Sequence, residues 1–432
     1  MQTVTVSEAD ATNAGSSTPR WRRRLGGERV ATLVLLFGQI FAAGGAFLVN
    51  LLAARVLDPS PRGDLAFALQ LSYVFTVLAL WGLERPYIAT RNNGFFSEYR
   101  AFTRMITPGV LAVIPLVVFA VVFLPFSTNW LWVGAALIAA YVLLNTLVRG
   151  VRVAYVVSRK WKPFAFNAIA TQVVIVLGAV ALVVVDADDP RMWMGVYLAS
   201  TAPSILLLIP LFRDRGGSAP GPDKAERKTL RRRGLVLLPS EFSNTAMLRS
   251  DRLLLPILSS PAELGLYVTV ATVLEMSTWP IQQWVDASLR RWTAAGADLA
   301  RSVGKILLQA LLFLVVVTAF MAAAAYAMIA FFLPDAYLAA ATVILPLAVA
   351  SVIHGLTRVQ QGLLIAFNCA GRVSIVEIIG IIVSVACYFV LIPQFGMLGA
   401  AGGSIAGSIT TFTVSIIFLT NARKRNRHHD TP

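Results

Sequence analysis

Apolar segments long enough to cross a membrane recur along almost the whole chain, and they restrict the fold more than any other feature. A helix rises about 1.5 Å per residue, so about 20 apolar residues span the roughly 30 Å hydrocarbon core of a bilayer. In that core every backbone hydrogen bond must be made within the protein, which favours helices for segments of this length. We therefore predict an all-α, polytopic membrane protein with about twelve transmembrane helices. The expected spans are 30–55, 64–90, 105–125, 131–157, 163–185, 193–212, 235–258, 263–288, 305–333, 337–366, 372–392 and 397–420.

The composition excludes a soluble domain and most catalytic chemistry. Apolar residues make up 57% of the chain and charged residues only 14%, whereas soluble domains are about a quarter charged. The net charge of +15 comes mostly from residues between the apolar segments, so we expect no nucleic-acid partner. Cys369 and Cys387 lie in or beside apolar segments and indicate neither a disulfide nor a metal site. The sequence has no phosphate-binding loop, metal-ligand cluster or Ser-His-Asp set, so we expect no metal, no cofactor and no enzyme.

The distribution of basic residues predicts the orientation in the membrane. If the N-terminus is cytosolic, the inside segments contain 28 of the 37 Lys and Arg residues. The outside loops then contain only Arg62 and Arg191. This asymmetry agrees with the rule that cytosolic loops are basic. We expect a multi-pass protein of the bacterial cytoplasmic membrane with both termini in the cytosol.

The longest predicted loop divides the chain into six helices plus six. It is rich in Gly, Pro, Lys and Arg, and we expect a flexible cytosolic linker. The predicted units are a disordered cytosolic N-tail at 1–29, an N-lobe at 30–212, the linker at 213–234, a C-lobe at 235–420 and a cytosolic C-tail at 421–432.

The two lobes are predicted to be repeats of each other. Pro59 and Gly63 follow the first span of the N-lobe, and Pro261 and Gly265 follow the first span of the C-lobe at the same spacing. Because six is an even number, both copies begin on the same side of the membrane. This predicts parallel six-helix repeats around a central cavity.

Polar residues inside the spans indicate what that cavity holds. An ionised side chain at the bilayer centre costs about 2.5–3.5 kcal/mol on insertion scales. His354, Arg358 and Gln361 lie at i, i+4 and i+7 and therefore share one helix face. In the span 263–288 a similar stripe begins at Glu275 and continues through Trp279, Gln282 and Asp286. Such stripes either line a hydrated cavity or pair with one another and only fix helix packing.

The first of these interpretations gives the predicted site. The expected anion-binding residues of the cavity are Arg85, Arg149, Arg152, Arg249, Arg252, Arg358, His354 and Gln361. The candidates for coupling to an ion are Glu241, Asp251, Glu275, Asp286 and Glu377. We predict a basic cavity that accepts anions.

Three segments resemble a known transporter family. The segment 52–69, with its Pro59-x-x-x-Gly63 turn, is similar to the first loop of polysaccharide-export flippases. The segment 250–267, which begins Ser-Asp-Arg-Leu-Leu-Leu, resembles the start of their second half, and 391–401 resembles their last hairpin. The family is that of O-antigen and teichoic acid flippases, in the multidrug/oligosaccharidyl-lipid/polysaccharide exporter superfamily. The resemblance covers about residues 30–420.

This resemblance implies a structure and a substrate. It implies a V-shaped pair of six-helix lobes that turns undecaprenyl-diphosphate-linked sugars from the cytosolic to the outer leaflet. Arginine would then shield the diphosphate, because its guanidinium group binds phosphate oxygens with two hydrogen bonds. The first span departs from the charged cavity of the family, since Gln39 and Asn50 are its polar residues near mid-membrane. The partners implied are the lipid-linked glycan, membrane lipid, and glycosyltransferases or a polymerase of the same pathway.

Three functions follow as hypotheses. The first is a flippase for lipid-linked oligosaccharide that works by alternating access in surface polysaccharide biosynthesis. The second is a multidrug exporter driven by H⁺ or Na⁺, which predicts drug resistance on overexpression. The third is a membrane enzyme or scaffold of envelope polysaccharide assembly, which predicts transfer activity in vitro.

Overall fold

Most of the predicted transmembrane helices are present in the part of the chain that the structure describes. The computed structural model describes residues 41, 44–91, 94–124, 131–158, 160–206, 208, 222–294 and 296–428. Within these residues, eight helices are long and apolar enough to cross a membrane, and a shorter apolar helix covers Gly44–Val56. The chain is an all-α, polytopic membrane protein, as predicted. The expected N-tail at 1–29 lies outside the described residues.

The first lobe begins with the helix Gly44–Val56 and ends before the long helix α10. Its other helices are α2 (Pro59–Leu80), α3 (Glu84–Thr90), α4 (Phe95–Phe123), α5 (Leu131–Val157), α6 (Trp161–Val184), α7 (Pro190–Ala199) and α8 (Ala202–Leu206). The helices that follow are α10 (Lys224–Leu258), α11 (Pro261–Glu275), α12 (Trp279–Ala294), α13 (Gly296–Phe332), α14 (Ile344–Ala366) and α15 (Ala370–His428).

Two of the predicted spans are broken in the structure, and the last two meet at a sharp turn. The span 64–90 is divided between α2 and α3 at Trp81 and Gly82, which have positive φ angles of 52° and 65°. The span 263–288 is divided by the short 3-10 helix η2 (Met276–Thr278) between α11 and α12. The last two spans, 372–392 and 397–420, are two helices that together carry the label α15, and the chain folds back between them at Gly396, where φ is 53° and ψ is −126°. Glycine tolerates such angles at little cost.

The linker predicted at 213–234 is only partly a loop. Residues 213–221 lie outside the described part of the chain, but α10 is helical from Lys224 onward. Asp223 caps this helix by accepting a hydrogen bond from the backbone N–H of Glu226 at 2.6 Å. Leu230 is 2% exposed and packs among apolar side chains of α3, α4 and α5. Burial of Leu230 therefore holds the start of α10 against the first lobe, although the composition of this segment predicted a flexible linker.

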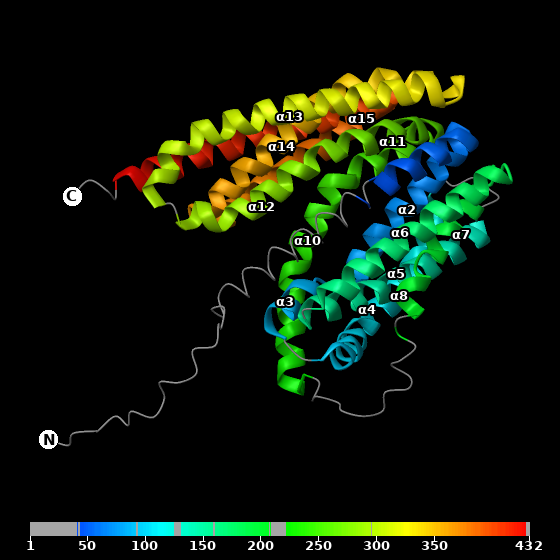
Figure 1. Cartoon of the computed structure of the whole chain (residues 1–432), viewed down its shortest axis with the longest axis horizontal. Helices are drawn as coiled ribbons and strands as arrows, with labels where there is room; N and C mark the ends of the chain where they lie inside the picture. Colours follow the sequence, from blue (N-terminus) through cyan, green and yellow to red (C-terminus); the bar gives the residue numbers. More distant parts are fainter. Residues whose placement is uncertain are drawn as a thin grey trace, which may run out of the picture.

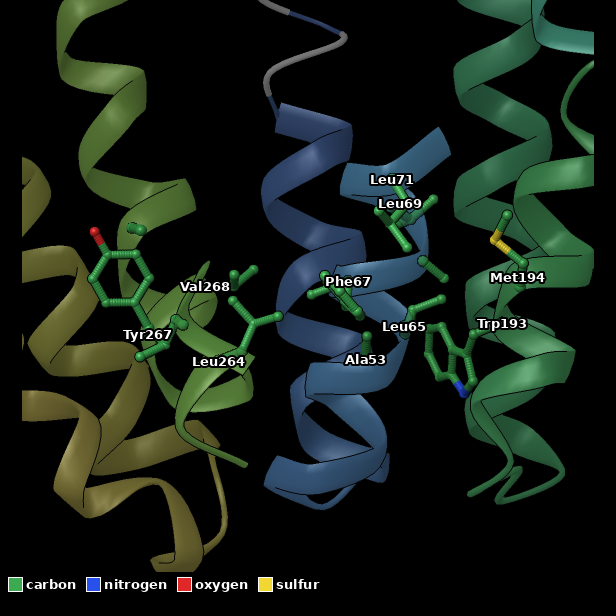
Figure 2. Close-up of a cluster of buried hydrophobic side chains, with 14 of the residues drawn as sticks. Ala53, Leu65, Phe67, Leu69, Leu71, Trp193, Met194, Leu264, Tyr267 and Val268 are labelled. Atoms are coloured by element: carbon green, nitrogen blue, oxygen red, sulfur yellow. The ribbon is translucent and has the colours of Figure 1, made fainter. Parts of the chain in front are cut away.

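The two groups of helices form a V (Figure 1). Helices α2 to α8 form one arm and α11 to α15 the other, and α10 runs between them towards α3. The arms meet where α2 packs against α11, and Figure 2 shows Leu264 and Val268 of α11 facing Phe67, with Trp193 and Met194 behind it. This shared apolar core joins the lobes at one end.

The repeated turns predicted from the sequence lie against each other at this junction. A Cβ atom at Gly63 would overlap the carbonyl oxygen of Pro261, and a Cβ atom at Gly265 would overlap that of Pro59. The contact is therefore reciprocal, as expected for two related halves meeting across a pseudo-twofold axis. Only glycine allows the two helix starts to approach this closely.

Polar contacts also join the lobes beside these turns, and one corrects a prediction. Asn50 donates a hydrogen bond to the carbonyl oxygen of Thr269 at 3.1 Å, and the Tyr337 hydroxyl donates to that of Leu57 at 2.7 Å. Arg62 was expected in an outside loop, but it is 6% exposed and donates to Asn50 Oδ1 at 2.5 Å. Arg62 is part of the lobe junction, because the turn before α2 is short and the residue already lies in the first turns of this helix, where it is buried between the lobes.

Candidate functional site

A cavity of about 620 Å³ lies on the inner side of the second lobe. It is lined by residues of α10, α11, α12, α14 and α15, and Arg85 of α3 reaches it from the first lobe. Of the predicted site residues, it brings together Arg85, Asp251, Glu275, Asp286, His354, Arg358, Gln361 and Glu377. The polar stripes predicted on two separate spans therefore face one common space.

The α14 stripe carries the best-defined hydrogen bonds in this cavity. Arg358 donates to Gln361 Oε1 at 3.2 Å and to Glu377 Oε1 of α15 at 3.3 Å. Gln361 is 4% exposed, and its amide nitrogen has no hydrogen-bond partner. An unpaired buried donor costs about 1–3 kcal/mol. Since Gln361 also lines the cavity, this buried donor lies directly behind the cavity wall.

The second stripe lies where α11 turns into α12. Glu275, Trp279, Gln282 and Asp286 all line the cavity, as their spacing predicted. The turn η2 between the two helices keeps their faces in register although it interrupts the α-helical hydrogen bonds. Arg252 of α10 is 4% exposed and forms an ion pair with Glu275. That arginine lies behind the cavity wall and not on its surface.

Hydroxyl groups complete the wall between α10, α11 and α15. Tyr267 donates to Asp251 Oδ2 at 2.7 Å, and the Tyr388 hydroxyl lies 2.9 Å from Ser404 Oγ. The cavity is also lined by Ser351, Ser374, Ser384, Ser408 and Thr411. The sequence analysis missed these residues. The available signal was the recurrence of Ser, Thr and Gly along 380–411, which is unusual on a lipid-facing helix.

Three of the predicted cavity arginines lie elsewhere in the structure. Arg249 donates to Gln70 of α2 and stacks over the ring of Tyr73 at 4.3 Å, so it joins the lobes. Arg149 and Arg152 of α5 lie 3.8 and 3.9 Å from the carboxylate of Glu84. None of the three lines the cavity among the residues that the structure describes there.

One predicted ion-coupling residue cannot be placed. Glu241 belongs to α10, but its side chain lies outside the described part of the chain, as does Gln39 of the first predicted span.

The charge of the cavity differs from the prediction. The described residues lining it include four carboxylates, and only two arginines. Arginine therefore does not dominate the described lining, because Arg149, Arg152, Arg249 and Arg252 are engaged in contacts between helices. Two of the carboxylates, Glu275 and Glu377, are paired with Arg252 and Arg358. The wall is therefore a set of ion pairs, amides and hydroxyls.

Comparison with solved structures places this fold. A multidrug resistance MATE transporter of the MOP superfamily in an inward-facing conformation matches with a TM-score of 0.59 at 12% identity, over 93% of this chain and all of that one. The lipid II flippase MurJ in an inward closed conformation gives 0.59 at 11% identity, over 91% of this chain and 87% of that one. The chain has the fold of MATE and MurJ transporters.

Other comparisons are consistent with this limited sequence similarity. A eukaryotic MATE transporter matches with a TM-score of 0.54 at 12% identity, over 92% of this chain and all of that one. No protein-family model matches the chain. No curated protein matches it either. The superfamily resemblance found in the sequence thus agrees with the fold, while the O-antigen and teichoic acid exporter family stays a prediction.

Proposed function

We propose that this protein is a flippase that moves lipid-linked oligosaccharide, carried on undecaprenyl diphosphate, across the bacterial cytoplasmic membrane by alternating access. Its role would be in surface polysaccharide biosynthesis, with both termini in the cytosol. The fold, shared with transporters that include a lipid II flippase, supports this proposal.

The observation that carries the proposal is the polarity of the cavity wall. Sugar hydroxyls both donate and accept hydrogen bonds, so a glycan needs a wall that offers both. The wall has amides such as Gln282 and Gln361, hydroxyls such as Tyr388, and the carboxylate of Asp286. Trp279 adds an aromatic surface on which a sugar ring can stack. An apolar drug would leave most of these groups without partners.

A complementation experiment tests the proposal. In a deletion strain, lipid-linked intermediates should accumulate and surface polysaccharide should be lost, and the wild-type gene should restore both. Arg358→Gln should fail to complement, because the pair with Glu377 and the bond to Gln361 are lost together. Arg191→Gln, at a partly exposed position where the arginine pairs with Asp189 away from the cavity, is the control and should complement fully. Full complementation by Arg358→Gln would contradict the proposed role of the cavity.

The excess of carboxylates in the cavity favours a second candidate function. A multidrug exporter coupled to H⁺ or Na⁺ needs an acidic group that alternates between cation and substrate, and Asp286 is such a group on the cavity wall. This function predicts resistance to cationic drugs on overexpression and no lipid-linked intermediate after deletion. A membrane enzyme or scaffold is the remaining alternative, and the fold of transporters argues against it. Glycosyltransferases or a polymerase of the same pathway are the partners that the first function would require.

A further inference from the structure

A groove separate from the cavity lies between α3 and the first turns of α10. Its volume is about 740 Å³, within the roughly 300–1,000 Å³ usual for small-molecule sites. Lys228, Arg232 and Arg233 line it from α10, and Arg85 lines it from α3. All four of these basic residues are exposed. The rest of its lining is Thr229 and the apolar residues Pro86, Ala89, Val236 and Leu237.

The groove leads to the cavity. Arg85 lines both spaces, so the two are adjacent at this residue. Figure 1 shows α3 beside the lower half of α10, at the open end of the V and away from the junction of α2 with α11. A molecule that reaches the cavity from this end passes the groove.

Contacts on both sides of the groove hold its walls in place. At one end Arg91 forms an ion pair with Glu226 at 3.1 Å. Burial lowers the pKa of Arg91, but hydrogen bonds from its guanidinium group to Glu98 and Glu226 outweigh this and raise the pKa above its ordinary value. At the other end a Cβ atom at Gly234 would lie 2.8 Å from the Trp81 carbonyl oxygen. The basic side chains are therefore presented on a fixed support.

Two carboxylates of the same two helices are bound by arginines that do not line the groove. Glu226 is paired with Arg91, and Glu84 lies against Arg149 and Arg152. No acidic residue is among the described residues that line the groove. Clustered cations repel one another unless an anion lies between them. The groove thus has charge complementarity to a compact anion with an attached apolar chain.

We propose that this groove is a docking site for the diphosphate of a prenyl-linked substrate at the mouth of the cavity, with the apolar residues of the lining receiving the first units of the chain. This docking site rests on the proposed function. It adds a binding step that comes before the substrate enters the cavity. Arg232 and Arg233 bind the phosphate oxygens through their guanidinium groups, which suit such oxygens geometrically. Arg85 then contacts the same diphosphate as the head group moves inward.

The number of cations favours a diphosphate over an ordinary phospholipid. A single phosphate diester carries one negative charge and would match the charge of only one cation of the groove. A diphosphate carries more charge in a slightly larger group, so it can contact cations on both walls of the groove. Basic residues in this segment also orient the protein in the membrane. That role depends on the total charge of the segment and not on which positions line the groove.

Binding of farnesyl diphosphate to the purified full-length protein tests the site. The groove variant is Lys228→Gln with Arg232→Gln. The matched control is Lys224→Gln with Arg231→Gln, which removes the same charges from exposed positions of the same helix that do not line the groove. We expect the groove variant to bind at least about tenfold more weakly, because charge-assisted hydrogen bonds are lost. The control should bind as the wild type does, and farnesol should not bind.

Each other outcome would overturn the site. These are absence of binding to the wild-type protein, equal weakening in the groove variant and the control, and equally effective competition by phosphatidylglycerol in nanodiscs. Arg358→Gln separates the site from the proposed function. If this cavity variant alone lost farnesyl diphosphate, the diphosphate would be held in the cavity and the flippase would stand without the groove. If the deletion strain accumulated no lipid-linked intermediate, the proposed function would fail whatever the groove binds.

Discussion

Individual buried charges in this protein divide into structural pairs and residues that face the cavity. Arg252 is 4% exposed and lies between Asp251 and Glu275, whereas the Glu275 side chain is 45% exposed to the cavity. The sequence identified all three residues as embedded charges. It could not separate them, because their spacing fixes only the helix face and not which neighbour fills the space beside it.

This asymmetry predicts unequal effects on stability. Arg252→Ala should lower the free energy of unfolding by about 3–5 kcal/mol, because it leaves the buried Asp251 without its charge partner. Glu275→Gln should cost about 1 kcal/mol or less, since water reaches the exposed carboxylate and weakens the pair. Denaturant unfolding in detergent micelles measures both. Equal losses of unfolding free energy in the two variants would contradict the expected difference between the buried Arg252 and the exposed Glu275.

Two neighbouring glutamines allow stability to be separated from transport. Gln361 lines the cavity with an unpaired amide nitrogen, while Gln360 is fully buried, lacks partners for both amide atoms and does not line the cavity. Gln360→Leu removes a buried group without partners, so the free energy of unfolding should stay equal or rise by about 1 kcal/mol, whereas Gln361→Leu also removes the acceptor of the Arg358 hydrogen bond and should lower it by about 1 kcal/mol. Only Gln361→Leu should abolish complementation of a deletion strain. Loss of transport in Gln360→Leu as well would indicate a packing effect.

For the helices, the length of the apolar segments predicted the helix positions better than the composition of the polar segments predicted the loops. The span 131–157 coincides with α5 and 163–185 closely matches α6 (Trp161–Val184), whereas α4 begins at Phe95, well before the predicted span 105–125. The helical start of α10 was not predicted, because packing of Leu230 on the first lobe outweighs a polar composition. The breaks at Trp81 and at η2 were not predicted either. These breaks depend on tertiary contacts of α3 and α12, which the hydrophobic periodicity of the sequence does not predict.

The repeated turns give a prediction for the helix junction. Gly63→Val should destabilise the protein by about 1–3 kcal/mol or more, because the new side chain overlaps the backbone of Pro261. It should also open the end at which α2 and α11 meet. Gly304→Ala on α13 is the control, since a Cβ atom there meets nothing within 4 Å. Thermal unfolding and labelling of a cysteine placed beside Gly63 would report both effects.

If Gly63→Val unfolded at the wild-type temperature and left the neighbouring cysteine protected, the close approach of α2 and α11 would not be required. Gly265→Val should behave like Gly63→Val because the contact is reciprocal.

For the whole molecule, the sequence predicted the two lobes and the gathering of polar stripes, but not the charge of the cavity. Arginine count alone suggested a basic interior. The structure places Arg249 in the lobe contact and Arg149 and Arg152 beside Glu84, while the carboxylates face the cavity. Four cations, Arg85, Lys228, Arg232 and Arg233, instead line the groove adjacent to the cavity. The molecule thus presents a basic approach to a polar, hydrogen-bonding chamber.

The most direct test of the flippase mechanism is translocation of lipid-linked oligosaccharide in proteoliposomes that contain the purified protein. We predict that labelled glycan placed in one leaflet becomes accessible to an impermeant reagent on the other side, and that Gln361→Leu prevents this while Gln360→Leu does not. If the glycan stayed inaccessible with wild-type protein while a cationic dye was transported, the protein would be a drug exporter and the flippase mechanism would be contradicted.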